Sequence, residues 1–239
     1  MDTCLIFKNL FNYDHINPIP HNIPDGVDPI YITDSSQNAH IATSFGWKVY
    51  VTDMFKEIGD DSFERRKAIA FINCYPERII PELLQYTYIF ICDSNVRSFD
   101  PDYKTFVAHK SPLKALYLTT GWYSGSDNTI YKEMQRSMMN QRWKYNFKEI
   151  KESTLKYIHQ LNDKGIADSD MPVASAKYIG WNIGHPNKHT IADNVYEEYL
   201  IHLQGNIIFS YILHMYPDDI THYINSFKHG SVGNHLSTY

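Results

Sequence analysis

The sequence has no long hydrophobic run, and this absence excludes a membrane-spanning protein. No stretch of its 239 residues approaches the roughly 18 continuous apolar residues that a transmembrane helix needs. The opening residues, MDTCLIFKNLF, combine an early acidic residue with a short apolar run, which is not the pattern of a signal peptide. We therefore expect a cytoplasmic protein.

Cysteine is scarce, and the glycine-rich phosphate-binding motifs are missing. The three cysteines include no CxxC pair, which argues against a disulfide framework and against a zinc knuckle. Cys92 lies within an apolar run and is expected in the core. Neither GxxxxGK[ST] nor GxGxxG occurs, so the usual signatures of phosphoryl-transfer and dinucleotide-binding enzymes are absent.

The chain also lacks an excess of positive charge. Its formal net charge of −5 argues against a protein that coats nucleic acid. The segment from Lys132 to Lys164 nevertheless holds eight basic and four acidic residues, in a pattern typical of a long amphipathic helix. A solvated helix face explains this charge, and a local anionic partner remains open.

Short apolar segments alternate with helical patterns along the chain. We predict strands at 4–7, 30–33, 47–52, 88–92 and 115–120. Helical spacing begins at Ser62, placed as an N-cap, recurs from Ile130 to Leu161 before a stop at Gly165, and runs from Asn194 to Met215. Alternating strands and helices imply a largely parallel sheet that is covered by helices.

Three of the predicted strands are followed by an aspartate. The segments YITD, VYVTD and FICD end in Asp34, Asp53 and Asp93. Open α/β sheets bind ligands just beyond the carboxyl ends of their strands, so these acids indicate a polar rim at one edge of the sheet. After Asp93 come Ser94 and Asn95, and this triplet suits either a tight turn or a metal–phosphate site.

The ordered motifs of the chain resemble those of nucleotide-sugar glycosyltransferases with the GT-A fold. The resemblance is to a small plant and bacterial group, long known as a domain of unknown function, that is related to glycosyltransferase family 8. It extends from Cys4 to Tyr216 and rests on the segments NYDHINPIP, YITD, WKVYV, ERRKAIAFINCYPERIIPE, FDPDYKTF, TIYKEMQRSM, YIGWNIGHP and NVYEEYLIHLQGNIIFSYIL.

This resemblance implies a fold and assigns different functions to the two halves of the chain. The fold would be α/β, GT-A-like and Rossmann-related, with a mostly parallel central sheet covered by helices. We expect a single glycosyltransferase domain, in which residues 1–125 bind the nucleotide sugar and residues 126–239 form an acceptor-side half with long helices.

The resemblance also implies a DxD-like metal site at the end of the strand 88–92. Asp93 and Asn95 would hold Mn²⁺ or Mg²⁺, which bridges the two phosphates of the donor, and Ser94 would lie in the same nucleotide-sugar site. Asn95 stands where the family has an acid, so the metal would be held more weakly. His229 is the nearest match to a C-terminal His-x-x-Gly metal ligand, although Gly230 follows it directly.

Further donor contacts are implied at Asp34 and at the basic start of the helix after Ser62. Asp34 matches a position that contacts the nucleoside, while a strand-end turn explains it equally well. Arg65, Arg66 and Lys67 would hold phosphates or sugar, and a solvated helix end is the plain alternative.

The catalytic residues are less defined by the resemblance. The family's Asp-Gln pair near the reaction centre falls on Gly205 and Asn206, so neither residue type is retained. Glu197 or Glu198 would serve as general base on an acceptor hydroxyl. The alternative is a pair of acids at a helix N-terminus, where negative charge is favourable.

The predicted function is metal-dependent transfer of a hexose or pentose from a nucleotide sugar to an acceptor hydroxyl. The acceptor would be a glycan, a protein or a hydroxylated base in DNA. A chain without a signal segment suits a bacterial or viral enzyme that acts in the bacterial or host-cell cytoplasm. A nucleotide-sugar-binding module of the same fold that has lost catalysis is the alternative.

Overall fold

The computed structural model describes residues 2–12, 15–19, 23–59, 62–93, 110–120, 130, 132, 147–166, 173–202 and 204–223. The strands are β1 (Thr3–Asn9), β2 (Val27–Thr33), β3 (Lys48–Val51), β4 (Tyr88–Asp93), β5 (Leu116–Thr120), β6 (Ala174–Asn182) and β7 (Ile220–Tyr223). The helices are α1 (Ser36–Ser44), α2 (Ser62–Cys74), α3 (Pro76–Ile79), the 3-10 helix η1 (Pro81–Gln85), α6 (Phe147–Asp163), α7 (Lys188–Ile201) and α8 (Gly205–Met215). None of the helices in this part of the chain is long and apolar enough to cross a membrane.

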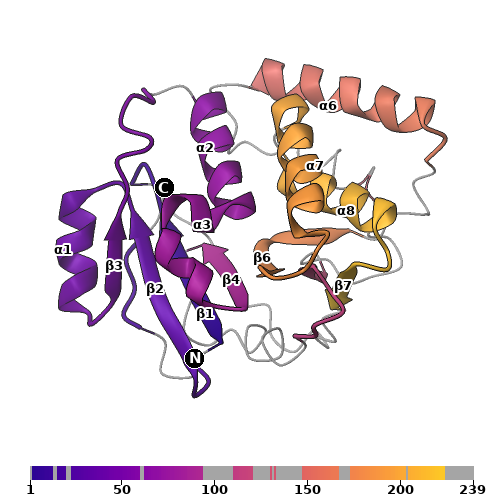
Figure 1. The fold of residues 1–239 in the computed structure, drawn as a ribbon. Helices are drawn as coiled ribbons and strands as arrows, with labels where there is room; N and C mark the ends of the chain where they lie inside the picture. Colours follow the sequence, from indigo (N-terminus) through magenta and orange to yellow (C-terminus); the bar gives the residue numbers. More distant parts are fainter. Residues whose placement is uncertain are drawn as a thin grey trace, which may run out of the picture.

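The strands form one mixed sheet with the order β3-β2-β1-β4-β6-β5-β7 (Figure 1). Strands β1 to β4 are mutually parallel where they pair, and β5 pairs in parallel with β7. Within the described sheet only β6 runs against its neighbours, β4 and β5. The prediction of a mostly parallel α/β sheet covered by helices is therefore confirmed.

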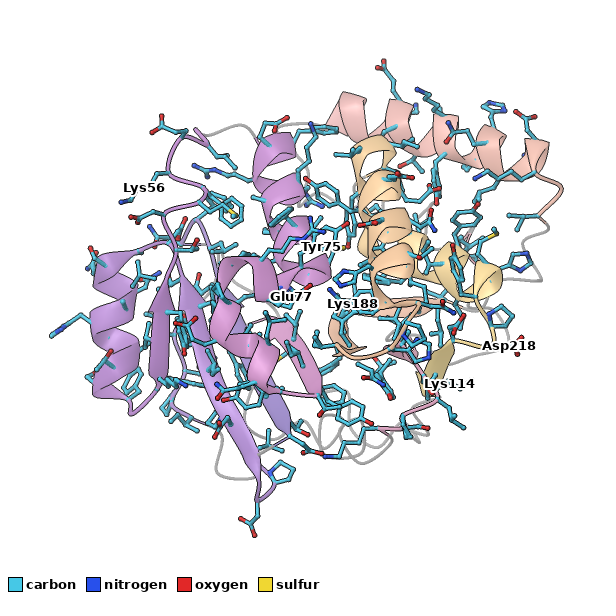
Figure 2. All side chains as sticks on the ribbon, in the orientation of Figure 1. Lys56, Tyr75, Glu77, Lys114, Lys188 and Asp218 are labelled. Carbon is cyan, nitrogen blue, oxygen red and sulfur yellow. The ribbon has the colours of Figure 1, made fainter. Side chains whose placement is uncertain are left out.

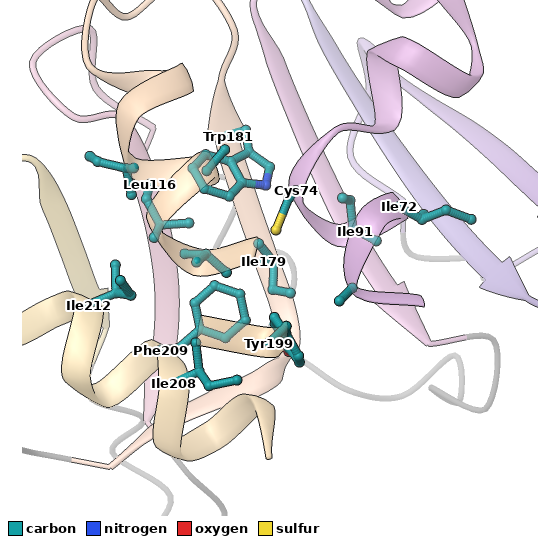
Figure 3. Close-up of a cluster of buried hydrophobic side chains, with 14 of the residues drawn as sticks. Ile72, Cys74, Ile91, Leu116, Ile179, Trp181, Tyr199, Ile208, Phe209 and Ile212 are labelled. Atoms are coloured by element: carbon teal, nitrogen blue, oxygen red, sulfur yellow. The ribbon is translucent and has the colours of Figure 1, made fainter. Parts of the chain in front are cut away.

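Both faces of the sheet are covered, because successive residues of a strand point to opposite sides. In β1, Cys4 and Ile6 belong to a large apolar cluster that also contains residues of α2, α6, α7 and α8. Figure 3 shows part of this cluster, in which Trp181 of β6 lies near Cys74. Leu5 and Phe7 belong to a smaller cluster on the other face, with Ala42 of α1. All three cysteines are buried, and burial raises the pKa of the Cys4 and Cys74 thiols, as expected for core residues.

Two predicted helices differ from the observed ones. The continuous helix expected from Asn194 to Met215 is two helices, because the backbone is extended at His202 and α8 restarts at Gly205. Leu200, near the end of α7, is 46% exposed. Ser62 is itself the first residue of α2 and not the residue before it. The stop at Gly165 is confirmed, since α6 ends at Asp163 and Gly165 has a left-handed φ of 71°.

Candidate functional site

The carboxyl ends of β1 to β4 lie at one edge of the sheet. Asn9 pairs with Thr33, Thr33 pairs with Val51, and Lys8 pairs with Asp93. Asp34, Asp53 and the last residue of β4, Asp93, therefore occupy the same edge, as the sequence predicts. Of Asp93 the structure describes the backbone. Ser94, Asn95 and His229 lie outside the described residues.

Asp34 holds the turn that follows β1. Both of its carboxylate oxygens lie 3.1 Å from the backbone nitrogen of Phe11, which donates to them. Phe11 and Asn12 have φ values of 58° and 54°, a left-handed conformation that is unfavourable for residues other than glycine. The Asn38 amide donates to Asn12 Oδ1 at 2.8 Å. Side-chain contacts from β2 and α1 thus stabilise a strained turn at the predicted nucleoside position.

The three basic residues at the start of α2 point in different directions, because successive helical residues are rotated by about 100°. Arg65 lies with its guanidinium carbon 5.2 Å from the centre of the Phe11 ring and donates from Nε to the Gly59 carbonyl at 2.8 Å. Arg66 is close enough to His202 to lower its pKa. Lys67 forms an ion pair of 2.7 Å with Glu64. The structure therefore brings Arg65 to the Asp34–Phe11 turn, whereas Lys67 is engaged by Glu64 and Arg66 lies near His202.

A shallow pocket of about 170 Å³ lies beside this turn, between the segment after β3, α2 and α7. Phe55, one of its lining residues, has its ring centre 6.4 Å from that of Phe11. Burial raises the pKa of Tyr196, which lines the pocket from α7. The other lining residues are Met54, Ile58, Glu64, Lys67, Ala68 and Phe71.

The beginning of α8 lies beside the carboxyl end of β4. Tyr178 of antiparallel β6 pairs with Cys92, so Ala176, two residues earlier, lies just beyond that end. The Ala176 nitrogen donates to Asn206 Oδ1 at 2.8 Å, and this bond occurs where the β5–β6 pairing shifts register. Gly205 and Asn206, the positions that the resemblance aligns with a catalytic pair, thus lie close to the carboxyl end of β4.

Gly205 leaves no room for a side chain at that point. A Cβ atom on Gly205 would lie 2.7 Å from the Ala176 Cβ and would collide with the Tyr199 hydroxyl. An aspartate therefore does not fit at this position without movement of α7 or β6. The amide oxygen of Asn206 is already engaged by the β6 backbone.

Glu197 and Glu198 lie in the last turns of α7, which begins at Lys188. The alternative of an acid pair at a helix N-terminus is therefore wrong. Strand β6 is antiparallel to β4, so β6 ends beside the start of β4. Helix α7 then runs back toward the carboxyl end of β4, and its last residues lie near the beginning of α2 (Figure 1). Glu197 is exposed, whereas Glu198 is half-buried with Oε1 3.8 Å from Lys164 Nζ.

Sequence reasoning missed a group of buried polar side chains between α6 and α7. The His202 ring stacks on the Tyr157 ring at 4.9 Å between centres. Thr154 lies one turn before Tyr157 on α6, and Glu198 lies one turn before His202 at the end of α7. Within the described residues, both His202 nitrogens, the Thr154 and Tyr157 hydroxyls and Glu198 Oε2 are buried without a hydrogen-bond partner. Burial, with a smaller effect from Arg66, lowers the pKa of His202 to about 3. Burial and the Glu198 carboxylate raise the pKa of Tyr157.

The donor set implied for a metal suits a hard divalent cation. A carboxylate, an amide oxygen and an imidazole are ligands that Mn²⁺ accepts, and Mg²⁺ accepts the oxygens. The one member of this set within the described backbone, Asp93, ends a strand at the edge where ligands bind in open sheets. Among the described side chains, no group of three His, Cys, Asp or Glu residues is arranged to hold a metal ion.

Comparison with known proteins places the fold. No protein-family model and no curated protein sequence matches the chain. The bifunctional glycosyltransferase WbbM, in an apo structure, matches with a TM-score of 0.51 and 10% identity over 92% of this chain and 38% of WbbM. Mouse xyloside xylosyltransferase 1 matches with a TM-score of 0.44 and 10% identity, over 92% of this chain and 83% of its own. The S. cerevisiae mannosyltransferase Ktr4p matches with a TM-score of 0.44 and 9% identity, over 83% of this chain and 60% of its own.

The likeness to WbbM at this identity concerns the fold. Together with the sheet order and the helices on both faces, it defines the chain as a protein with the GT-A glycosyltransferase fold.

Proposed function

We propose that the chain is a glycosyltransferase that takes its sugar from a nucleotide-sugar donor and depends on a divalent metal. The observation that supports this most directly is the shared edge of β1, β2 and β4, which carries the Asp34–Phe11 turn and ends at Asp93. The proposal keeps the relation to the family 8 group that the motif order suggests.

In this proposal, the nucleoside lies over the turn that Asp34 holds, and Arg65 contributes positive charge beside it. The diphosphate extends toward the end of β4. Asp93, with Asn95 and His229, would hold Mn²⁺ or Mg²⁺, which supplies charge that offsets the departing diphosphate. Ser94 belongs to the same donor site. Arg66 and Lys67, which lie near His202 and Glu64, would supply further positive charge to the same donor.

The acceptor would approach from the side of α7 and α8. Glu197 or Glu198, at the end of α7, would take the proton of the attacking hydroxyl. The hydroxyl belongs to a glycan, a protein or a hydroxylated base in DNA. Exposed Lys151 and Lys156 on α6 offer contacts to an anionic acceptor. A salt titration of duplex DNA binding separates the acceptors, since phosphate contacts give a steep salt dependence.

One observation favours a second candidate, a binding module without transferase activity. Gly205 excludes an acidic side chain and Asn206 is engaged by the β6 backbone, so the place of the family's catalytic pair carries no free acid. Donor binding without turnover or hydrolysis would establish this candidate.

The decisive experiment is a thermal-shift screen of nucleotide sugars, with and without Mn²⁺, followed by a hydrolysis assay of each donor that binds. A rise in Tm with one donor, enhanced by Mn²⁺, supports the proposal. The Asp93→Ala variant is expected to keep its fold and lose metal-dependent hydrolysis. No shift with any nucleotide sugar rejects both candidates, and full activity of Asp93→Ala removes this carboxylate from the metal site.

A further inference from the structure

The shallow pocket beside the Asp34–Phe11 turn has both an apolar and a polar part. Five of its eight lining residues are apolar, namely Met54, Phe55, Ile58, Ala68 and Phe71. The other three, Glu64, Lys67 and Tyr196, contribute a carboxylate, an ammonium and a hydroxyl group. A mostly apolar lining with a few polar groups is typical of a site for a small ligand.

The polar groups of the pocket lie together. Glu64 Oε1 is 2.7 Å from Lys67 Nζ. Burial raises the pKa of the Tyr196 hydroxyl, and the charges of Lys67 and Glu64 act on it as smaller effects, so this hydroxyl lies near both. The Tyr196 ring stands edge-on to Phe71, with 5.7 Å between the ring centres. Hydrogen-bond donors and acceptors therefore occur side by side, next to an aromatic wall.

The size and charge of the pocket restrict its ligand. An apolar cavity of about 150 Å³ accepts benzene, so the volume of about 170 Å³ is enough for one six-membered ring. Sites for drug-sized molecules begin at about 300 Å³, so a whole nucleotide does not fit. The Glu64 carboxylate repels a second carboxylate, which disfavours an acidic sugar. A neutral pyranose fits, because it has C–H groups on its faces and hydroxyls at its edge, and each hydroxyl both donates and accepts.

The position of the pocket relates it to the acceptor. Helices α2 and α7, which line it, pack against each other (Figure 1). Tyr196 directly precedes Glu197 on α7, the helix that carries the proposed general base. On the other side, the ring centre of Phe55 is 6.4 Å from that of Phe11, in the turn proposed for the nucleoside. The pocket thus lies between the proposed donor position and the helix of the base.

We propose that this pocket is the acceptor subsite and that it binds the terminal sugar of an uncharged glycan. The inference rests on the proposed function and selects the glycan among the acceptors named there. A C–H face of the sugar packs on Phe55 and Phe71, and its hydroxyl edge bonds to Tyr196, Lys67 and Glu64. A free glycoside is accordingly a ligand without any nucleotide.

The test measures the binding of methyl glycosides to the full chain by saturation-transfer NMR. The probes are methyl glycosides of neutral hexoses, pentoses and 6-deoxyhexoses. We expect at least one to bind at millimolar concentration, with the strongest saturation on the C–H protons of one ring face. Methyl glucuronide should bind more weakly than methyl glucoside. Absence of binding by every neutral glycoside overturns the inference.

Two variants locate the bound glycoside. Ala68→Leu extends into the pocket and should weaken binding at least about tenfold, because the added atoms occupy the ring's place. Tyr196→Phe keeps the ring and removes one hydrogen bond, so binding should weaken by about threefold to tenfold. Tyr50→Phe is the matched control, since Tyr50 lies on β3 beside Lys48 and outside the pocket lining, and binding should be unchanged.

Circular dichroism establishes that each variant is folded. If Ala68→Leu does not fold, Tyr196→Phe and its control decide the question alone. Binding by a folded Ala68→Leu or Tyr196→Phe variant that equals binding by the natural protein overturns the inference. So does duplex DNA with 5-hydroxymethylcytosine that displaces the glycoside and fails to bind to Ala68→Leu, because the pocket then belongs to a base.

The outcomes also separate this inference from the function on which it rests. If the natural protein binds a nucleotide sugar but no methyl glycoside, the pocket is not the acceptor subsite and the transferase proposal stands. If methyl glycosides bind through the pocket but no nucleotide sugar binds, the pocket keeps a sugar-binding role and the transferase proposal fails.

Discussion

Lys188, in the first turn of α7, forms a buried ion pair with Glu77 of α3 (Figure 2). The Lys188 side chain is fully buried, and its ammonium also donates to the Cys74 carbonyl at 3.2 Å. It lies 5.4 Å from the centre of the Tyr75 ring and 5.6 Å from that of Trp181. The pair therefore connects the start of α7 to the end of α2 and to α3, at the end of the sheet opposite the carboxyl end of β4.

Removal of one member of this pair is expected to be strongly destabilising. Lys188→Met leaves the Glu77 carboxylate buried without its partner, and we expect the free energy of unfolding to fall by about 3–5 kcal/mol. Denaturant unfolding measures this change. The control is Lys114→Met, since Lys114 donates to the Asp218 carbonyl at the surface (Figure 2), and its loss should lower stability by less than about 1 kcal/mol.

A double substitution distinguishes the charge from the packing. Lys188→Met combined with Glu77→Leu removes both charges and should recover most of the lost stability, because a buried pair is often replaced by apolar side chains without net loss. A double variant as unstable as Lys188→Met alone would contradict this account.

The pH dependence of stability should contain a contribution from His202. Its pKa of about 3 in the folded state lies below the ordinary value of about 6.5, so between these values the unfolded chain binds a proton that the folded chain does not. Stability contributed by the neutral ring is complete above pH 6.5 and is lost as the pH falls, at up to about 1.4 kcal/mol per pH unit.

The variant His202→Phe keeps an aromatic ring against Tyr157 and removes this proton linkage. We expect its free energy of unfolding to fall less steeply than that of the natural protein between pH 6.5 and pH 4.5. The exposed His159 on α6 provides the control, since His159→Gln should retain the natural slope. Equal slopes for His202→Phe and the natural protein would show that His202 is accessible to protons in the folded state.

Gly205→Ala should lower stability. The added methyl group meets Tyr199 and Ala176, and such overpacking typically lowers stability by about 1–3 kcal/mol. Gly59→Ala is the matched control, because a Cβ there meets no atom within 4 Å. The added substitution Tyr199→Phe removes the colliding hydroxyl and should restore part of the stability. Thermal unfolding of Gly205→Ala, Tyr199→Phe, the double variant of these two and Gly59→Ala checks the expectation.

Asp34→Ala should loosen the turn after β1. It removes the acceptor of the Phe11 N–H, and a lost hydrogen bond to a charged group is worth about 1.5–3 kcal/mol. Asn12→Gly in the same chain should recover part of this, since glycine adopts the left-handed conformation without strain. Asp53→Ala, at the same edge but exposed, should change stability by less than about 0.5 kcal/mol. Nucleotide binding, measured in parallel, should weaken for Asp34→Ala and not for Asp53→Ala.

The strands and their shared edge were accessible from the sequence because they depend on local patterns. Apolar runs such as CLIF and YIFIC are long enough to be buried on both faces, and an aspartate follows several of them. Parallel pairing then brings the carboxyl ends together wherever the strands lie in the sheet. The position of Asp34 and of the Asp93 backbone followed from this rule.

The directions of individual side chains were not accessible in the same way. Arg65, Arg66 and Lys67 form a single basic run in the sequence, but the helix turns them toward Phe11, His202 and Glu64. The break between α7 and α8 carries no proline, and Gly205 alone marks it in a helical spacing that continues through Leu203. In the structure α8 is tied to β6 by two bonds, in which Asn206 and Ser210 accept from the backbone nitrogens of Ala176 and Ala174.

The sequence by itself determined the class of fold and the edge of the sheet at which the strand-end acids lie, because alternating apolar and helical segments and strand-end acids are local features. Only the tertiary structure decided that Lys8 lies beside position 93, that a Cβ atom at Gly205 would collide with Tyr199, and that His202 is buried against Tyr157. These relationships join residues from different elements. Their physical cause is packing and strand register, which no short stretch of sequence contains.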